Sequence, residues 1–361
     1  MKAIHIDRFV TVSPVTIVPT NDCSPIKDVA NVQPKDVTAP ELQSPKQLHI
    51  KITHAAVTHV DLLYAQGLHQ NNKRHVQPPF ILGTEFSGIV TAAPPTSPFK
   101  PGTRVLGGGL GSFAEEICVD GASVRLVPDQ WTNAEACAVG ASGAVSYGAL
   151  VSVAQVKSGE TVLVLGASGG LGVMAIQIAK ALGAKVIAVV GDAEKDAMVR
   201  RIGADAVVDY HDARWEEKVK DLTSGKQGVE VVYDAIGAVE SGIKCLKYRG
   251  RVVIVGFAAR GGKMENVRAN RILLKSAMVH GYRFGEDGRH DPQRTKDVWD
   301  GFMKLADGGK IQPVIYKENY CGLEAVSRAL EDAQKHRAWG RAVVRINEDA
   351  EKELHKQRAR L

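Results

Sequence analysis

The chain has 361 residues, 44% of them hydrophobic and 24% charged, a balance typical of globular proteins with about two domains. Its formal net charge of +6 comes from dispersed lysines and arginines, which favours a solvated surface over a nucleic-acid-binding patch. Five widely separated cysteines argue against a disulfide framework, and no apolar leader or run of eighteen apolar residues is evident, so we expect a cytoplasmic protein without a membrane span.

Short β-strands dominate the predictions for the first 130 residues. Alternating or β-rich segments bounded by Gly and Pro predict strands over 1–6, 48–57, 86–92 and 103–107. A polar, proline-rich stretch over 24–46 predicts an irregular surface loop.

Strands and helices alternate from about residue 131 onward. Thr132 and Glu135 have the spacing of a capping box that begins a helix. We then expect strands over 161–166, 184–190, 206–210, 229–237, 251–257 and 276–284, with helices over 170–183 and 192–203. Near-continuous Val/Ile runs between helices predict a parallel sheet buried on both faces. The remaining predictions are helices near 292–307 and 322–335, strands over 312–320 and 340–346, and a charged, frayed helical tail.

The segment VLVLGASGGLG, residues 162–172, passes from a strand through glycines into a helix. Gly166 would allow the sharp turn, Gly169 and Gly170 would let a pyrophosphate approach the backbone, and Gly172 would let the helix pack closely. The amides at the helix N-terminus would face the phosphates. The segment predicts dinucleotide binding, and a purely structural turn is the alternative.

The end of the second strand of this unit bears on the choice between NAD and NADP. A carboxylate that holds the ribose 2′-OH would follow Val190 directly, yet Gly191 stands there and Asp192 comes late. Lys195 could reach a 2′-phosphate and Tyr210 could line the same pocket, which favours NADP. Lys195 as an ordinary exposed helix residue is the alternative.

Two other enzyme classes lack their necessary residues. No tyrosine has a lysine four residues later, as a short-chain dehydrogenase requires. No H-E-x-x-H motif occurs, and His54, His59 and His69 have no evident fourth ligand, so we predict no metal site.

Several segments together resemble the medium-chain dehydrogenase/reductase superfamily, most closely its zinc-free quinone oxidoreductase branch. They include AAVTHVDLLYAQG, PPFILGTEFSGIV, GASGGLG and GRVVIVGF. The resemblance implies an α/β protein with a GroES-like β-barrel catalytic domain (1–130 with 286–361) and a doubly wound Rossmann NADP-binding domain (131–285). Zinc-containing relatives would place metal ligands at Thr58, at Thr84 and near Ala141, and structural-zinc cysteines within 100–115, all of which are absent.

The resemblance also implies site residues around a cleft between the two domains. Thr58, Asp61 and Tyr64 are the catalytic candidates, with Tyr64 either a proton donor or a wall of the pocket, and Asp61 more structural than catalytic. The cofactor-binding candidates are Ser142, Ser146, Gly166, Ser168, Gly169, Gly170, Leu171, Gly172, Gly191, Lys195, Tyr210, Gly256, Phe257, Phe284 and Arg337. Arg341 is an alternative to Arg337, and Phe284 would also line the substrate side.

These observations predict a zinc-independent reductase that transfers a hydride from NADPH to a quinone or an α,β-unsaturated carbonyl. The alternatives are an enoyl-thioester reductase of lipid or polyketide synthesis and a non-catalytic protein that binds NADPH and, weakly, RNA. We expect a small-molecule substrate, no membrane partner and a homodimer joined through the edge strand within 276–284.

Overall fold

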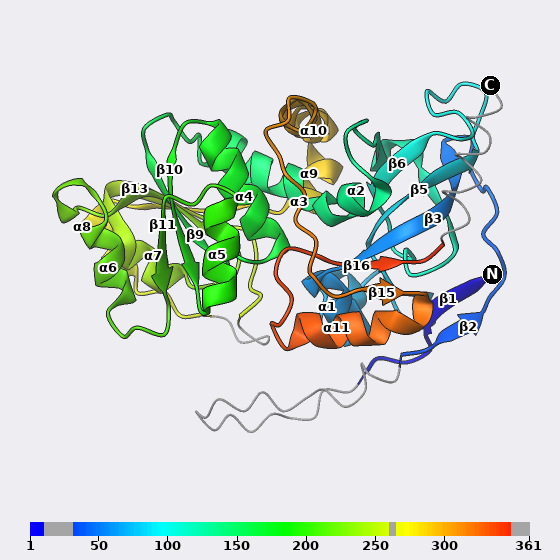
Figure 1. Cartoon of the computed structure of the whole chain (residues 1–361), viewed down its shortest axis with the longest axis horizontal. Coiled ribbons are helices and arrows are strands. Elements are labelled where there is room, and N and C mark those ends of the chain that lie inside the picture. Colours follow the sequence, from blue (N-terminus) through cyan, green and yellow to red (C-terminus); the bar gives the residue numbers. More distant parts are fainter. Residues whose placement is uncertain (11–31, 260–264, 348–361) are drawn as a thin grey trace. The chain divides into compact units, whose positions relative to one another are not determined.

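The structure is a computed structural model that describes residues 1–10, 32–259 and 265–347 (Figure 1). The chain divides into two compact units, residues 1–141 with 313–361 and residues 142–312. The predicted domain boundaries, after residues 130 and 285, lie earlier in the chain than the observed boundaries after residues 141 and 312. They differ because helix α2 (Asn133–Val139) packs on strands of the first unit, whereas α10 (Pro292–Asp307) packs on α3 (Ser142–Tyr147) of the second.

The first unit is rich in short strands, as predicted. Its strands are β1 (Lys2–Ile6), β2 (Pro34–Asp36), β3 (Gln47–Val57), β4 (Phe80–Ile81), β5 (Glu85–Ala92), β6 (Arg104–Gly108), β7 (Glu116–Asp120), β8 (Val124–Leu126), β15 (Tyr320–Cys321) and β16 (Ala342–Arg345). Its helices are α1 (His59–Ala65), η2 (Gln70–Lys73), η3 (Gly121–Ser123), α2, η6 (Leu323–Ala325) and α11 (Val326–Gln334).

Strand β3 organises the main sheet of this unit, whose order is β15-β16-β3-β5-β6-β8 with β7 also paired to β3. Alternate residues are buried in its first half and every residue from Ile52 onward is buried. Because side chains alternate between the two faces of a strand, the second half of β3 is covered on both faces. A second, small sheet has the order β2-β1-β4.

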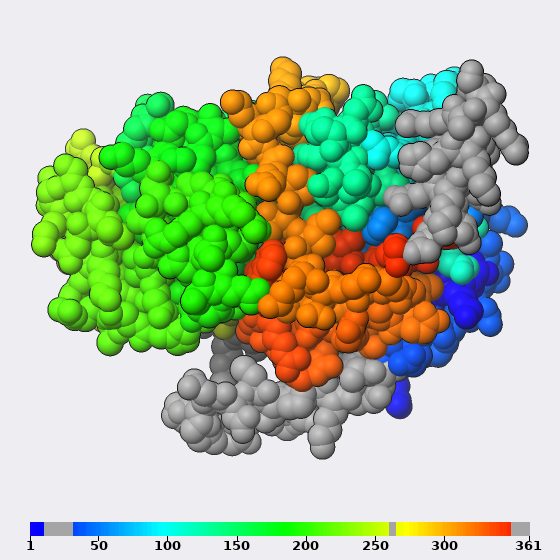
Figure 2. Space-filling model, viewed as in Figure 1, coloured from blue at the N-terminus to red at the C-terminus, as the bar shows by residue number. Residues whose placement is uncertain are grey.

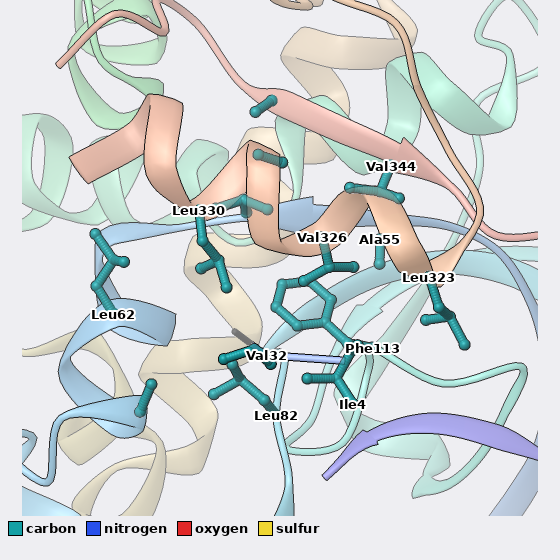
Figure 3. Packing of buried hydrophobic residues seen from close by; sticks show 14 of the residues in the cluster. Ile4, Val32, Ala55, Leu62, Leu82, Phe113, Leu323, Val326, Leu330 and Val344 are labelled. Atoms are coloured by element: carbon teal, nitrogen blue, oxygen red, sulfur yellow. The ribbon is translucent and has the colours of Figure 1, made fainter. Parts of the chain in front are cut away.

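Helix α11 covers an apolar core of the first unit. Figure 3 shows its Val326 and Leu330 pointing toward Phe113 and Leu82. Its Arg328 is exposed, and Figure 2 shows the outer side of the helix at the molecular surface. The apolar residues recur three and four positions apart, which is the spacing that gives a helix one buried face.

Phe113→Ala should lower the free energy of unfolding by about 3–5 kcal/mol, because the ring is fully buried in this core. Urea unfolding of the wild type and the variant measures the difference. Leu126→Ala is the control, since Leu126 is exposed on β8 and its truncation should change stability by no more than about 0.5 kcal/mol. Equal effects of the two substitutions would contradict this description of the core.

The second unit alternates strands and helices. Its strands are β9 (Thr161–Leu165), β10 (Lys185–Val190), β11 (Ala206–Asp209), β12 (Val229–Asp234), β13 (Leu246–Ile254) and β14 (Met278–Gly281). Its helices are α3, η4 (Gly148–Val153), α4 (Gly170–Ala181), α5 (Ala193–Arg201), α6 (Trp215–Asp221), η5 (Ser224–Lys226), α7 (Val239–Cys245), α8 (Ala269–Lys275), α9 (Phe284–His290) and α10.

All six strands of this unit are parallel, in the order β11-β10-β9-β12-β13-β14. Numbered from β9, this is the doubly wound order 3-2-1-4-5-6 of a Rossmann fold. Val162 to Leu165 of β9 are at most 1% exposed, as the apolar run predicted for a sheet covered on both faces. The parallel sheet predicted from the sequence is therefore confirmed.

Several predicted strands are shorter than expected, two of them markedly. The segment 312–320 contains only an isolated bridge at Ile315 and the start of β15, because Pro313 has no N–H to donate to a sheet. The segment 276–284 is a strand only over β14, since Ser276 adopts a left-handed conformation at the end of α8. Part of the predicted loop 24–46 and nearly all of the tail lie outside the described residues.

The stretch Asn133–Val153 is long and apolar enough, by length and composition, to cross a membrane, a feature that the sequence reading missed. In the structure it is divided into α2, α3 and η4, with Gly140 at φ +48° between the first two. Most of it is buried inside the protein. Core helices of globular proteins pass the same test, so this stretch is weak evidence for a membrane span.

Candidate active site

The glycine loop of the second unit connects β9 to α4. Gly166 has φ +75°, which permits the sharp turn off the strand. A Cβ on Gly172 would lie 2.2 Å from the Gly166 carbonyl oxygen, so no side chain fits there. At Gly169, the N-cap of α4, a Cβ would meet only that carbonyl oxygen, at 3.6 Å, and no side chain caps the helix. Gly169 therefore lacks a side chain although there is room for one. The first backbone amides of α4 are available to bind an anion.

The position of this loop in the sheet also fits a nucleotide. The strand order reverses between β9 and β12, which are neighbours. Ligands of doubly wound sheets bind at the carboxyl ends of the strands at such a reversal. Six candidate residues of the sequence analysis lie together on this loop and the helix start: Gly166, Ser168, Gly169, Gly170, Leu171 and Gly172.

Gly191, Lys195 and Tyr210 surround the end of β10. A Cβ on Gly191 would lie 2.5 Å from the Tyr210 ring, so the ring rests on the glycine backbone. Asp192 caps α5 by accepting the Lys195 amide at 2.8 Å, and the Lys195 ammonium lies 2.8 Å from the same carboxylate. The Asp192 carboxylate is therefore occupied by the helix cap and by Lys195. The Lys195 ammonium and the Tyr210 phenol lie on either side of the Gly191 backbone, which carries no side chain.

The other candidates of this unit have distinct surroundings. Ser146 is fully buried; its hydroxyl donates to the Leu171 carbonyl at 3.0 Å and contacts the Tyr233 hydroxyl at 2.9 Å, so it braces the start of α4. Gly256 lies where a Cβ would be 2.8 Å from the Ala235 carbonyl oxygen. The remaining candidates are the buried Ser142, the exposed Phe257, and Phe284, whose ring packs edge-on against Tyr282 and Trp299.

The two candidate arginines belong to the first unit and differ in exposure. Arg337 is more than half exposed, and its guanidinium lies 3.2 Å from Asp332. Arg341 is buried and forms an ion pair of 3.2 Å with Glu85. A role for Arg337 at a 2′-phosphate stays a prediction, and the buried ion pair disfavours Arg341 for it.

A buried hydrogen-bonded network joins two of the three catalytic candidates. Thr58 caps α1, and its backbone N–H and its hydroxyl donate to Asp61 Oδ2 at 2.7 and 2.9 Å. Thr84 donates to Asp61 Oδ1 at 2.8 Å, and the two threonine hydroxyls lie 3.3 Å apart. Asp61 is fully buried and Thr84 is partly exposed. Desolvation raises the Asp61 pKa to about 7, against the lowering effect of these hydrogen bonds.

The same network bears on whether these residues could bind a metal ion. By the family resemblance described above, two zinc-ligand positions of the zinc-containing relatives fall at Thr58 and Thr84, and both hydroxyls donate to Asp61. Within the described ranges, no group of three or more His, Cys, Asp or Glu side chains could hold a metal ion. Neutral hydroxyls are poor zinc ligands compared with thiolate and imidazole, so these residues do not fit zinc.

Tyr64, the third catalytic candidate, has different partners. Its hydroxyl accepts a hydrogen bond from Asn71 Nδ2 at 2.8 Å, and its ring stacks on His69 with centroids 4.2 Å apart. The side chain is 7% exposed and belongs to the core shown in Figure 3. Thr84, in contrast, was predicted only as a position where the relatives have a metal ligand and this chain has none. Its place directly before β5 was the signal that could have identified it.

Replacing Asp61 by Asn should change how stability depends on pH. The pKa in the folded state, about 7, lies above the ordinary value of 3.8, so the native state binds the extra proton between these values. Stability contributed by this group is therefore lost as pH rises through that window. Urea unfolding at several pH values should show the wild type losing stability relative to Asp61→Asn from about pH 4 to pH 7. A difference independent of pH would contradict the buried, neutral carboxyl.

Comparison with known protein families shows two matches. Residues 44–129 match the alcohol dehydrogenase GroES-like domain, and residues 170–303 match the zinc-binding dehydrogenase family. The zinc in the second description is part of the family's name and does not by itself place a metal in this chain.

Curated relatives and solved structures agree with these matches. Quinone oxidoreductase-like protein 2 of Bos taurus is 32% identical over 86% of this chain and 88% of its own length. A probable oxidoreductase from Mycobacterium abscessus is 31% identical, with a TM-score of 0.79 over 95% of this chain and 98% of its own. A mycobacterial protein solved with NADPH is 25% identical, with a TM-score of 0.80 over 95% of this chain and 99% of its own.

A further match comes from a much larger protein. The polyketide synthase GfsB of Streptomyces halstedii is 29% identical over 83% of this chain, which corresponds to 5% of the synthase. Together with the Rossmann-type unit, the relatives support a nicotinamide cofactor and confirm the predicted GroES-like and Rossmann architecture. The chain belongs to the quinone oxidoreductase-like proteins of the medium-chain dehydrogenase/reductase superfamily.

Proposed function

We propose that this protein is a zinc-independent, NADPH-dependent reductase of quinones or α,β-unsaturated carbonyls. The observation that carries the proposal is that Thr58 and Thr84, where the family resemblance would place metal ligands, both donate hydrogen bonds to Asp61. The relative solved with NADPH and the chemistry at the end of β10 support the cofactor.

The cofactor fits the second unit because of the residues that follow the ends of β9 and β10. The amides that start α4 would hold the pyrophosphate, and Gly169 leaves the room that it needs. Lys195 and Tyr210 would hold a 2′-phosphate beside Gly191. Bound NADPH would supply a hydride to the acceptor. The chain would bind and orient the acceptor through the first unit, with Asp61 kept out of water.

An enoyl-thioester reductase is the second candidate, and the likeness to one part of a polyketide synthase favours it. We also propose that the protein works in the cytoplasm. The acceptor classes are separated by measuring NADPH oxidation with quinones, enones and enoyl thioesters in parallel. Turnover with a thioester alone would select the second candidate, and no turnover with any acceptor would overturn the proposal.

We propose a homodimer formed through β14. This strand is the last in its sheet, and within the described chain its outer edge pairs with no other strand. Met278 and Val279 on β14 and Leu273 and Leu274 on the neighbouring α8 are exposed, from 37 to 78%. Light scattering should give twice the 38.8 kDa of one chain, and Met278→Asp should shift it toward the monomer. A wild-type monomer would overturn the dimer.

A further inference from the structure

The buried Asp61 carboxyl accepts hydrogen bonds only from threonine groups within the part of the chain that the structure describes. Its Oδ2 accepts the Thr58 amide and hydroxyl, and its Oδ1 accepts the Thr84 hydroxyl. No lysine, arginine or histidine among the described residues forms an ion pair with it. Without a cation nearby, burial favours the protonated form of a carboxyl.

The charged groups around Asp61 strengthen the preference for its protonated form. Glu85 follows Thr84 on β5 and acts on Asp61 as a second acid, which raises the Asp61 pKa. Arg341 is 3.2 Å from Glu85 and is engaged with that carboxylate rather than with Asp61. His59, on α1, is exposed at the start of the helix. The network thus holds a carboxyl that can store one proton near neutral pH.

The hydrogen atoms of the network can be arranged in two ways. When Asp61 is ionised, Thr84 donates to Oδ1 over 2.8 Å. When Oδ1 is protonated, its O–H donates to Thr84 Oγ1 across the same distance, and the Thr84 hydrogen is then free to point elsewhere. Thr84 is the partly exposed member, whereas Asp61 and Thr58 are buried. A proton can therefore leave the network through Thr84.

We propose that Asp61 and Thr84 form a proton relay, in which Thr84 is the catalytic residue that protonates the acceptor and Asp61 is the positioning residue that stores the proton. The inference rests on the proposed function and narrows its acceptor to α,β-unsaturated carbonyls. Protonation of carbon requires a donor held in place, whereas the oxygen of a reduced quinone takes a proton from water.

The relay delivers one proton to an acceptor that gains one hydride. The β-carbon of the acceptor gains the hydride, with its two electrons, from the reduced cofactor, and the C=C π pair moves to the α-carbon. The α-carbon forms a C–H bond with the proton of the Thr84 hydroxyl. Asp61 Oδ1 passes its proton to Thr84 Oγ1 and becomes a carboxylate, which water then reprotonates. One C=C double bond is reduced and one cofactor is oxidised.

Thr84→Val should lower kcat for an enone by at least about 100-fold, because the hydroxyl that delivers the proton is lost. Thr84→Ser should retain the rate and the solvent deuterium isotope effect on enone turnover, because the hydroxyl is kept. Thr91→Val is the matched control, since Thr91 lies exposed on β5, the strand that begins directly after Thr84. Asp61→Asn should also lose enone turnover, and the wild-type rate should fall as pH rises through about 7, as the stored proton is lost.

Infrared spectroscopy tests the stored proton without turnover. The wild-type minus Asp61→Asn spectrum should contain the C=O band of a protonated carboxyl at about pH 5, and the band should disappear above about pH 8. Absence of the band at the lower pH overturns the relay. So does wild-type enone turnover that Thr84→Val leaves intact. The proposed function itself fails, together with the relay that rests on it, if no acceptor is reduced while the band is present.

Discussion

Gly172→Ala should abolish tight NADPH binding and lower the free energy of unfolding by about 1–3 kcal/mol. The added Cβ would lie 2.2 Å from the Gly166 carbonyl oxygen and 2.6 Å from the Ala167 Cα. All of these atoms are backbone, so the helix start or the turn must move. Either movement misaligns the amides that would hold the pyrophosphate.

Gly169→Ala is the informative comparison. Its Cβ would have one neighbour, at the ordinary contact distance of 3.6 Å, and its φ of −81° suits any residue. Stability should therefore stay within about 0.5 kcal/mol of the wild type, while NADPH binding weakens because the methyl group occupies the phosphate position. Fluorescence titration with NADPH and urea unfolding measure the two quantities. If both variants bind NADPH like the wild type, the loop is only a structural turn.

Lys195→Ala should raise the Kd for NADPH by about 10–100-fold and leave the Kd for NADH unchanged. A hydrogen bond to a charged group contributes about 1.5–3 kcal/mol, and NADH has no 2′-phosphate for Lys195 to contact. The Gly191 backbone would contact the rest of the adenosine in both cofactors.

Lys180→Ala controls for the general loss of a positive charge. Lys180 lies on α4 of the same unit, and its ammonium is 2.8 Å from Asp205. Removal of the Lys180 side chain should weaken the binding of NADPH and NADH equally or not at all. Equal losses for NADPH and NADH in Lys195→Ala would mean that Lys195 contributes only through its charge, or through its contact with Asp192.

Local sequence signals predicted the second unit well. The Val/Ile runs that became β9 and β10 could be recognised because a strand buried on both faces needs apolar residues at every position. The capping box at Thr132 and Glu135 was also correct, since it depends on two neighbouring side chains. Gly166 and Gly172 could be assigned because steric rules for glycine are local.

Features that depend on distant contacts could not be predicted. The unit boundary at residue 141 depends on the packing of α2 against strands far away in the sequence. The Asp61–Thr84 hydrogen bond joins residues 23 positions apart, and no periodicity signals such a pair. Tyr64 was proposed from the resemblance of its segment to the family's substrate site, and its contact with Asn71 could not be foreseen from that resemblance.

Reduction by NADPH without a metal is tested most directly by one measurement. The purified protein, dialysed against a strong chelator, is assayed for NADPH and NADH oxidation with an enone. We predict full activity after chelation and a clear preference for NADPH. Activity that disappears on chelation and returns with zinc would contradict the account, as would a preference for NADH.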